Sequence, residues 1–125
     1  MARILIVDDD IDLLESSKMI LESGGHSVTT ASTAEEAEKI IDSRKFDAIF
    51  LDIMMQEPDD GINLARRLNK KGIKTPVVML SGVSRVTGYQ YGKCDEALPC
   101  TDFLEKPVTP QKLLEKVSEV INKKA

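Results

Sequence analysis

Five side chains that carry carboxylate, hydroxyl or ammonium groups follow short apolar runs of the sequence. They are Asp8, Asp9, Asp52, Ser81 and Lys106. If the apolar runs are strands of one parallel sheet, their carboxyl ends meet at one edge, and ligands of such sheets bind there. The sequence therefore predicts that three carboxylates, one hydroxyl and one ammonium group converge at that edge from distant segments.

Helix capping accounts for only part of the acidic set. Asp10 is a good N-cap for the segment that follows it, and the helix dipole favours acidic side chains in a first turn. Two carboxylates about 4 Å apart nevertheless repel each other by roughly 4 kcal/mol at an effective dielectric constant of 20. We expect a cation to offset this repulsion, and oxygen ligands with room for water and phosphate suit Mg²⁺.

Bound Mg²⁺ would permit phosphoryl transfer at this edge. Asp52 can attack phosphorus as a carboxylate nucleophile and form an acyl phosphate. Because the transition state is expanded and anionic, catalysis depends on positioning and on positive charge. Lys106 can pair with one phosphoryl oxygen, while Ser81 can donate a hydrogen bond to another. Taken singly, Lys106 is typical of a surface lysine and Ser81 of a strand-end turn, but the joint pattern predicts a catalytic set with Asp52.

The alternation of short apolar runs with longer amphipathic segments predicts an α/β fold with a parallel sheet. Five strands are expected, over Arg3–Val7, Ser27–Ala31, Asp47–Leu51, Pro76–Leu80 and Thr101–Leu104. The first, third and fourth are continuously apolar, which is typical of central strands covered on both faces. With right-handed crossovers this pattern favours strand order 2-1-3-4-5, a flavodoxin-like doubly wound five-stranded sheet with five helices.

Capping residues place the first two helices. The first is expected over Ile11–Glu22 and ends before two glycines that can adopt the left-handed cap conformation. Ser32 or Thr33, with Glu35 or Glu36 three residues later, forms a capping box for the second.

Length and composition limit the classes of protein and of site. With 125 residues, the chain has the size of one ordinary globular domain, expected over residues 1–125. The apolar run Ile4–Val7 is too short for a signal peptide or a membrane span, so a cytoplasmic protein is expected. A net charge of -4 without a basic stripe argues against direct nucleic-acid binding. The single histidine, His26, argues against histidine-based triads and multi-histidine metal sites.

Four segments carry a family resemblance, namely ILIVDDD, IFLDIMM, VVMLSG and DFLEKP. Together they resemble the signature segments of chemotaxis-type receiver domains of response regulators, over nearly the whole chain. The resemblance implies a two-component phosphorelay in which Asp52 accepts a phosphoryl group from a sensor histidine kinase or phosphotransfer protein. It also implies that Mg²⁺ binds Asp8, Asp9 and Asp52, with the main-chain carbonyl of Met54 as a further ligand.

The resemblance further implies how such a domain passes on its signal. Ser81 and Lys106 would be the hydroxyl and the lysine of the family, and Phe103 would change rotamer as Ser81 moves toward the phosphate. The face formed by the fourth helix, fifth strand and fifth helix would then change its partners, including a downstream protein that the sequence does not identify. Such a domain catalyses only its own phosphorylation and dephosphorylation, so we expect a signalling domain and not an enzyme.

Two stretches depart from the family pattern. Gln56 stands where receivers usually have a proline, and Gly61 comes one residue late, in a loop expected to border the metal. The segment between the fourth and fifth strands is a few residues longer than usual, and three residues interrupt its expected helix. They are Gly88, Gly92 and Pro99. A short, displaced or mobile fourth helix is expected, because each interior glycine weakens a helix by up to about 1 kcal/mol.

Two other functions are compatible with parts of this pattern. A haloacid-dehalogenase-like phosphatase would use Asp8 as its nucleophile, but the chain lacks the usual cap segment. A pseudo-receiver would be an unphosphorylated scaffold, although all five pocket residues are present. The chain ends after the fifth expected helix, so we expect a stand-alone receiver.

Overall fold

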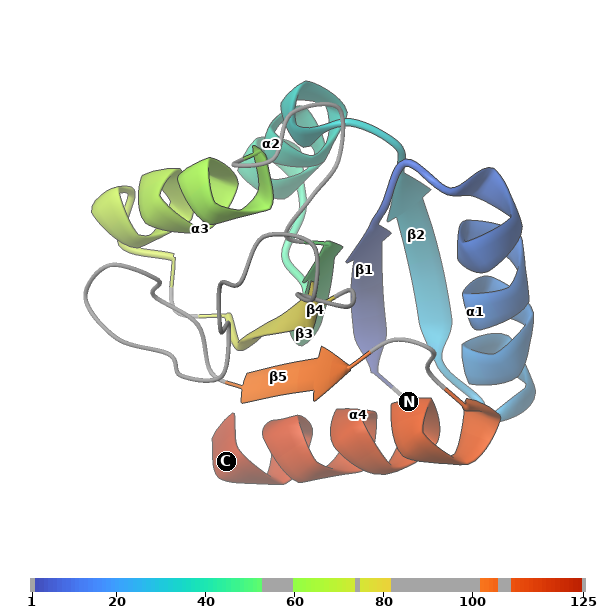
Figure 1. Cartoon of the computed structure of the whole chain (residues 1–125). Helices are drawn as coiled ribbons and strands as arrows, with labels where there is room; N and C mark the ends of the chain where they lie inside the picture. The colour runs from blue at the N-terminus through green and yellow to red at the C-terminus, as the bar shows by residue number, and fades with distance from the viewer. Residues whose placement is uncertain (1, 53–59, 74, 82–101, 106–108, 125) are drawn as a thin grey trace.

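The structure, a computed structural model, describes residues 2–52, 60–73, 75–81, 102–105 and 109–124. Within these ranges the chain forms five strands and four helices (Figure 1). The strands are β1 (Arg3–Val7), β2 (Ser27–Ala31), β3 (Ala48–Asp52), β4 (Val77–Ser81) and β5 (Asp102–Glu105). The helices are α1 (Ile11–Ser23), α2 (Ala34–Ser43), α3 (Asp60–Lys70) and α4 (Pro110–Lys124).

The five strands form one parallel sheet in the order β2-β1-β3-β4-β5, which confirms the predicted topology. β1 and β2 have their predicted bounds, whereas the other three strands each begin and end one residue later than predicted. Asp52 and Ser81 are therefore the last residues of β3 and β4 and not the first residues after them. Because β1 pairs with both β2 and β3, the winding of the chain reverses at β1, and ligands of doubly wound sheets bind beyond such a switch point.

Helices cover both faces of the sheet, and the strand side chains divide between two cores. α2 and α3 lie against one face, while α1 and α4 lie against the other (Figure 1). Along β1, Leu5 and Val7 join the core under α2 and α3, and Ile4 and Ile6 join the core under α1 and α4. All four side chains are at most 1% exposed. Burial on both faces explains why the central strands are continuously apolar.

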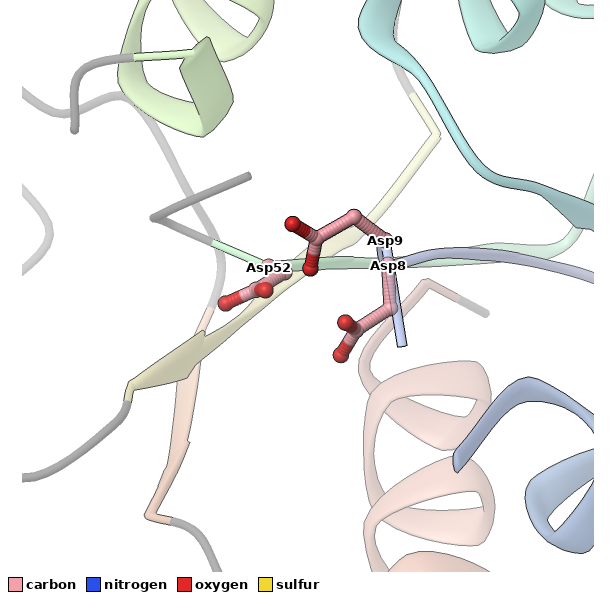
Figure 2. A group of neighbouring side chains, drawn as sticks. All are labelled: Asp8, Asp9 and Asp52. Carbon is pink, nitrogen blue, oxygen red and sulfur yellow. The ribbon is translucent and has the colours of Figure 1, made fainter. Parts of the chain in front are cut away.

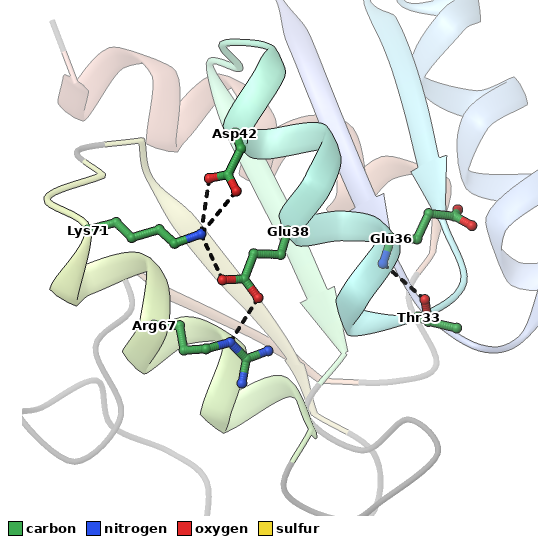
Figure 3. Close-up of polar contacts among 6 residues, drawn as sticks. All are labelled: Thr33, Glu36, Glu38, Asp42, Arg67 and Lys71. Atoms are coloured by element: carbon green, nitrogen blue, oxygen red, sulfur yellow. Dashed lines mark hydrogen bonds and ion pairs between the residues drawn. The ribbon is translucent and has the colours of Figure 1, made fainter.

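Side-chain caps fix the first turns of α1 and α2 as the sequence predicts. Asp10 is the N-cap of α1, and its carboxylate accepts a hydrogen bond from the backbone N–H of Leu13 at 3.2 Å. Thr33 is the N-cap of α2, and its hydroxyl accepts a hydrogen bond from the N–H of Glu36 at 3.1 Å (Figure 3). The Glu36 carboxylate in turn accepts a hydrogen bond from the N–H of Ser32 at 3.4 Å. Thr33 and Glu36 therefore form the capping pair.

A glycine pair reverses the chain between α1 and β2. The N–H of Gly24 donates to carbonyls of the last turn of α1, and Gly25 has a φ of +90°. Of the two glycines, only Gly25 has the left-handed conformation predicted for a cap. Beyond it, the N–H of Ser27 donates to the carbonyl of Ala2 at 2.8 Å, which starts the pairing of β1 with β2. His26 lies at this amino-terminal edge of the sheet, as predicted.

Ionic contacts join α2 to α3 and to the turn that follows it (Figure 3). Glu38 contacts the Arg67 Nε atom at 2.9 Å and the Lys71 Nζ atom at 2.7 Å. Lys71 also contacts Asp42 at 3.0 Å. The hydrogen bond from Lys71 is the main cause that lowers the pKa of Glu38 below its usual value, although partial burial opposes it. These contacts hold together the two helices on one face of the sheet.

Several predictions concern parts of the chain outside the described residues. The helix expected between β4 and β5 falls on residues 82–101, and the altered loop at Gln56 falls on residues 53–59. The described part of the chain contains no helix with the length and apolar character needed to cross a lipid bilayer.

Candidate functional site

Three carboxylates cluster at the carboxyl ends of β1 and β3. Asp8 and Asp9 directly follow β1, and Asp52 is the last residue of β3. One oxygen from each side chain lies within 4.8 Å of the other two. Figure 2 shows these side chains around the ends of the two strands. The parallel pairing of β1 with β3 brings the three acids together, as the sequence predicts.

Two of the three carboxylates are buried and held by the fold. Asp8 is 0% exposed and Asp52 is 4% exposed, whereas Asp9 is exposed. The backbone N–H of Asp8 donates to the carbonyl of Ala31 at 3.1 Å, and its carboxylate accepts a hydrogen bond from the N–H of Asp10 at 2.9 Å. The contact with Ala31 extends the β1–β2 pairing past Val7 and anchors Asp8. This contact could not be predicted from the sequence, because a backbone carbonyl leaves no side-chain signal.

The run of three aspartates divides into separate roles. Asp8 and Asp9 contribute to the carboxylate cluster with Asp52. Asp10 instead caps α1, as its hydrogen bond from Leu13 shows. The cap holds the first turn of α1 immediately after the two clustered acids, so the helix fixes the backbone that carries them.

Ser81 reaches the same edge of the sheet, one strand further along. Its neighbour Leu80 pairs with Asp52, and Ser81 is the last residue of β4. On the far side, Ser81 pairs with Glu105, the last residue of β5. The backbone register therefore places Asp52 and Ser81 at adjacent strand ends. Lys106 and Met54, the other two predicted members of the site, lie outside the described residues.

The chemistry of the cluster suits a hard divalent cation. Carboxylate pairs at 4.8 Å repel by about 3.5 kcal/mol at an effective dielectric constant of 20, and burial of two of them strengthens the repulsion. Every clustered ligand atom is an oxygen, and Mg²⁺ typically takes one or two carboxylates together with water and phosphate oxygens. Asp8, Asp9 and Asp52 therefore fit such an ion in both charge and ligand type.

A doubly wound parallel sheet with an acidic cluster at its switch point defines a class of α/β domains that bind their ligands at this edge. Within that class, residues 4–118 match the family model described as "Response regulator receiver domain". The chain therefore belongs to the response regulator receiver family of two-component signalling.

Individual relatives agree with this assignment. The chain is 30% identical to the alkaline phosphatase synthesis transcriptional regulatory protein PhoP of Bacillus subtilis, over 97% of this chain and 49% of PhoP. It is 33% identical to the response regulator MprA of Mycolicibacterium vanbaalenii, over 97% of this chain and 51% of MprA. The receiver domain of a Francisella response regulator has a TM-score of 0.84 at 29% identity and is covered completely, as is this chain. The chain thus spans about half the length of the curated relatives that it matches.

Proposed function

We propose that Asp52 is the phosphoacceptor of this receiver domain and that Asp8, Asp9 and Asp52 together hold Mg²⁺. The observation that carries the proposal is the cluster of three carboxylates within 4.8 Å at the carboxyl ends of β1 and β3. Such a cluster repels an incoming phosphoryl group unless a cation is present. Mg²⁺ would supply the positive charge that lets an anionic phosphoryl group approach Asp52.

In the proposed reaction, a carboxylate oxygen of Asp52 attacks phosphorus and a P–O bond forms. The bond between phosphorus and the donor histidine nitrogen breaks, and that nitrogen keeps the electron pair and takes up a proton. Asp52 is 4% exposed and sits at a strand end, so its carboxylate has little freedom to leave the line of attack. The buried Asp8 would orient the metal from the neighbouring strand.

Ser81 and Lys106 complete the proposed catalytic set. The register that pairs Leu80 with Asp52 supports a role for Ser81 as hydrogen-bond donor to a phosphoryl oxygen. Lys106 directly follows β5, and its ammonium group would pair with another oxygen. The main-chain carbonyl of Met54, two residues after Asp52, would be a further Mg²⁺ ligand, as in the family that this chain resembles.

Phosphorylation would change the surface formed by the segment between β4 and β5, by β5 and by α4. In this proposal Ser81 moves toward the phosphate and Phe103 follows it. Phe103 pairs with Met79 in the backbone register of β4 and β5, two residues before Ser81. This arrangement supports a short route from the phosphorylation site to the outer strand of the sheet.

Residues 1–125 would form a single receiver domain that acts in the cytoplasm. Response regulators work with histidine kinases, and a sensor histidine kinase or phosphotransfer protein is the proposed donor. The proposed output is a contact with a downstream protein, with no direct binding of nucleic acid or membrane by this domain. Its only catalysis would be its own phosphorylation and dephosphorylation.

Intact-mass spectrometry after incubation with acetyl phosphate tests the proposal. The wild-type protein should gain one phosphoryl group in Mg²⁺ and none in EDTA, and Asp52→Asn should gain none. Asp12→Asn is the matched control, because Asp12 is exposed on the first turn of α1 and lies outside the cluster. Asp12→Asn should react like the wild type.

Other outcomes of the same experiment favour the other functions. An adduct that persists in Asp52→Asn and disappears in Asp8→Asn would indicate a phosphatase-like nucleophile at Asp8. No adduct on the folded wild-type protein, together with no response to beryllofluoride, would indicate a pseudo-receiver.

A further inference from the structure

A concave region lies at the edge of the sheet opposite the acidic cluster. It is a hollow of about 900 Å³ between the end of α2, the start of β3 and the turn that precedes β4. Its apolar lining includes Ile41, Phe46 and Ile49, each at most 7% exposed. Ile49 lies three residues before Asp52 on β3, so about 10 Å of strand separates the hollow from the proposed phosphorylation site.

Three exposed cations border this hollow. They are Arg3, Arg44 and Lys45. A smaller hollow of about 320 Å³ on the β2 side shares all three and is also lined by Phe46. Among the residues that the structure describes, none forms an ion pair with these cations. They concentrate positive charge in one place on a chain whose net charge is -4.

The acidic residues of the same lining already have partners. The Asp42 carboxylate accepts hydrogen bonds from the Lys71 ammonium group at 3.0 and 3.2 Å (Figure 3). The Asp47 carboxylate accepts a hydrogen bond from the backbone N–H of Arg3 at 2.8 Å. The three cations outnumber these two carboxylates, and Asp42 is paired with Lys71, so the lining carries a net positive charge.

The end of α2 explains part of this charge but not the hollow. α2 ends at Ser43, and Arg44 and Lys45 follow directly, where positive charge can offset the partial negative charge of the last carbonyls. Helix stabilisation alone does not require an apolar recess beside these cations. An apolar recess bordered by a few polar groups is typical of small-molecule sites, whose volumes are about 300–1,000 Å³.

We propose that this hollow binds a small organic anion that has a flat apolar body and one carboxylate or phosphate group. The apolar body would lie against Ile41, Phe46 and the partly buried Ile73, while the fully buried Ile49 forms the floor beneath them. The anionic group would lie between Arg44 and Lys45, which border both hollows. This binding site is separate from the acidic cluster, so it does not depend on the proposed phosphorylation of Asp52.

An NMR titration of ¹⁵N-labelled protein with 2-naphthoate tests the proposal, and 2-naphthamide is the neutral control probe. Saturable shifts in 2-naphthoate are expected at backbone amides of residues 41–47 and 72–73 and at Arg3. 2-Naphthamide should bind about tenfold more weakly, because it lacks the charge that contacts the cations. The titration is run without Mg²⁺, so that the carboxylate probe has no metal to bind.

Two double variants separate a local site from a general charge effect. Arg44→Gln/Lys45→Gln should weaken 2-naphthoate binding about tenfold, because both exposed charge contacts are lost. Lys18→Gln/Lys39→Gln removes the same net charge from exposed positions outside the hollow and should bind like the wild type. The spectra also report whether each variant is folded, and all four substituted side chains are exposed.

Three results would overturn the proposal. The first is the absence of saturable shifts in the lining of the hollow. The second is equal affinity for 2-naphthoate and 2-naphthamide, and the third is equal weakening by the two double variants. Retention of Mg²⁺-dependent phosphorylation by Arg44→Gln/Lys45→Gln would show that the two sites act separately, as proposed.

Discussion

Replacement of Asp9 by asparagine should make the metal-free protein more stable. Asp9 contributes one carboxylate to the cluster with Asp8 and Asp52, and its oxygen lies within 4.8 Å of an oxygen of each. At that separation a carboxylate pair repels by about 3.5 kcal/mol at an effective dielectric constant of 20 and by about 0.9 kcal/mol in bulk water. Because Asp9 is exposed, the lower figure applies to each of its two pairs.

The expected gain for Asp9→Asn in EDTA at low ionic strength is therefore about 1–2 kcal/mol in free energy of unfolding. For a domain of this size that gain corresponds to a rise in Tm of roughly 3–8 °C. Urea denaturation followed by circular dichroism measures the free energy directly. Asp12→Asn removes the same charge from the first turn of α1, outside the cluster, and should give no such gain.

Added Mg²⁺ should reverse the order of stability. A ligand at one hundred times its Kd stabilises the folded state by about 2.7 kcal/mol, provided that it binds only that state, and this exceeds the expected advantage of Asp9→Asn in EDTA. The wild type and Asp12→Asn should show this increase, whereas Asp9→Asn should lose most of it. Destabilisation of Asp9→Asn in EDTA would refute the assumed repulsion, and equal stabilisation of all three proteins by Mg²⁺ would refute the assigned ligands.

Three further predictions concern the scaffold. Burial is the main cause that lowers the pKa of His26 below 6.5, and the positive chain terminus lowers it further. The Nδ1 atom of His26 accepts a hydrogen bond from the N–H of Ala2 at 3.2 Å. The unfolded chain therefore binds a proton at His26 more readily than the folded chain, so the free energy of unfolding should fall as pH falls below about 6.5. Urea denaturation of His26→Asn should show a free energy of unfolding that depends less on pH. Glu38→Gln removes the carboxylate that bridges Arg67 and Lys71, so Tm should fall. The difference in Tm from the wild type should shrink in 1 M salt, where the Debye length is about 3 Å. An undiminished difference would indicate that lost packing, and not lost charge, lowers Tm. Gly25→Ala places a side chain at a φ of +90°, and no other atom lies near the new Cβ. Backbone strain alone should therefore lower the free energy of unfolding by about 1–2 kcal/mol. An unchanged denaturation midpoint would contradict this.

The order of the sheet could be predicted because strand composition reports burial. All residues of β1, β3 and β4 except one terminal residue of each are apolar and buried, whereas β2 carries Thr29 and Thr30 at half-buried positions of an edge strand. Element ends were less predictable. The sequence predicts Asp52 and Ser81 directly after their strands, because polar side chains suggest a strand end, but backbone pairing continues through both residues.

The acidic site could be predicted from the positions of the aspartates at the ends of predicted strands. The carboxyl ends of all strands in a parallel sheet lie at one edge, whichever residues connect the strands. The division of roles among Asp8, Asp9 and Asp10 was only partly predictable. Asp10 was recognised as a cap from its place before an amphipathic segment, and the structure confirms this. The contact of Asp8 with the carbonyl of Ala31 could not be predicted, because it depends on backbone register and not on side-chain type.

The hollow at the opposite edge was also missed. Arg3 is about 40 residues from Arg44 and Lys45 in the sequence, and the pairing of the start of β1 with β3 brings it to the same place. A basic pair after a helix is typical of dipole compensation, so its sequence pattern gives no sign of a neighbouring apolar recess.

Chemical trapping of the phosphorylated residue tests the central claim most directly. Sodium borohydride reduces an aspartyl phosphate to homoserine with release of phosphate, and peptide mass spectrometry then locates the altered residue. After treatment with acetyl phosphate and Mg²⁺, homoserine is predicted at position 52 and should be absent when EDTA replaces Mg²⁺. Homoserine at position 8 or 9, or equal labelling of Asp52 in EDTA, would contradict the assignment of Asp52 as a Mg²⁺-dependent phosphoacceptor.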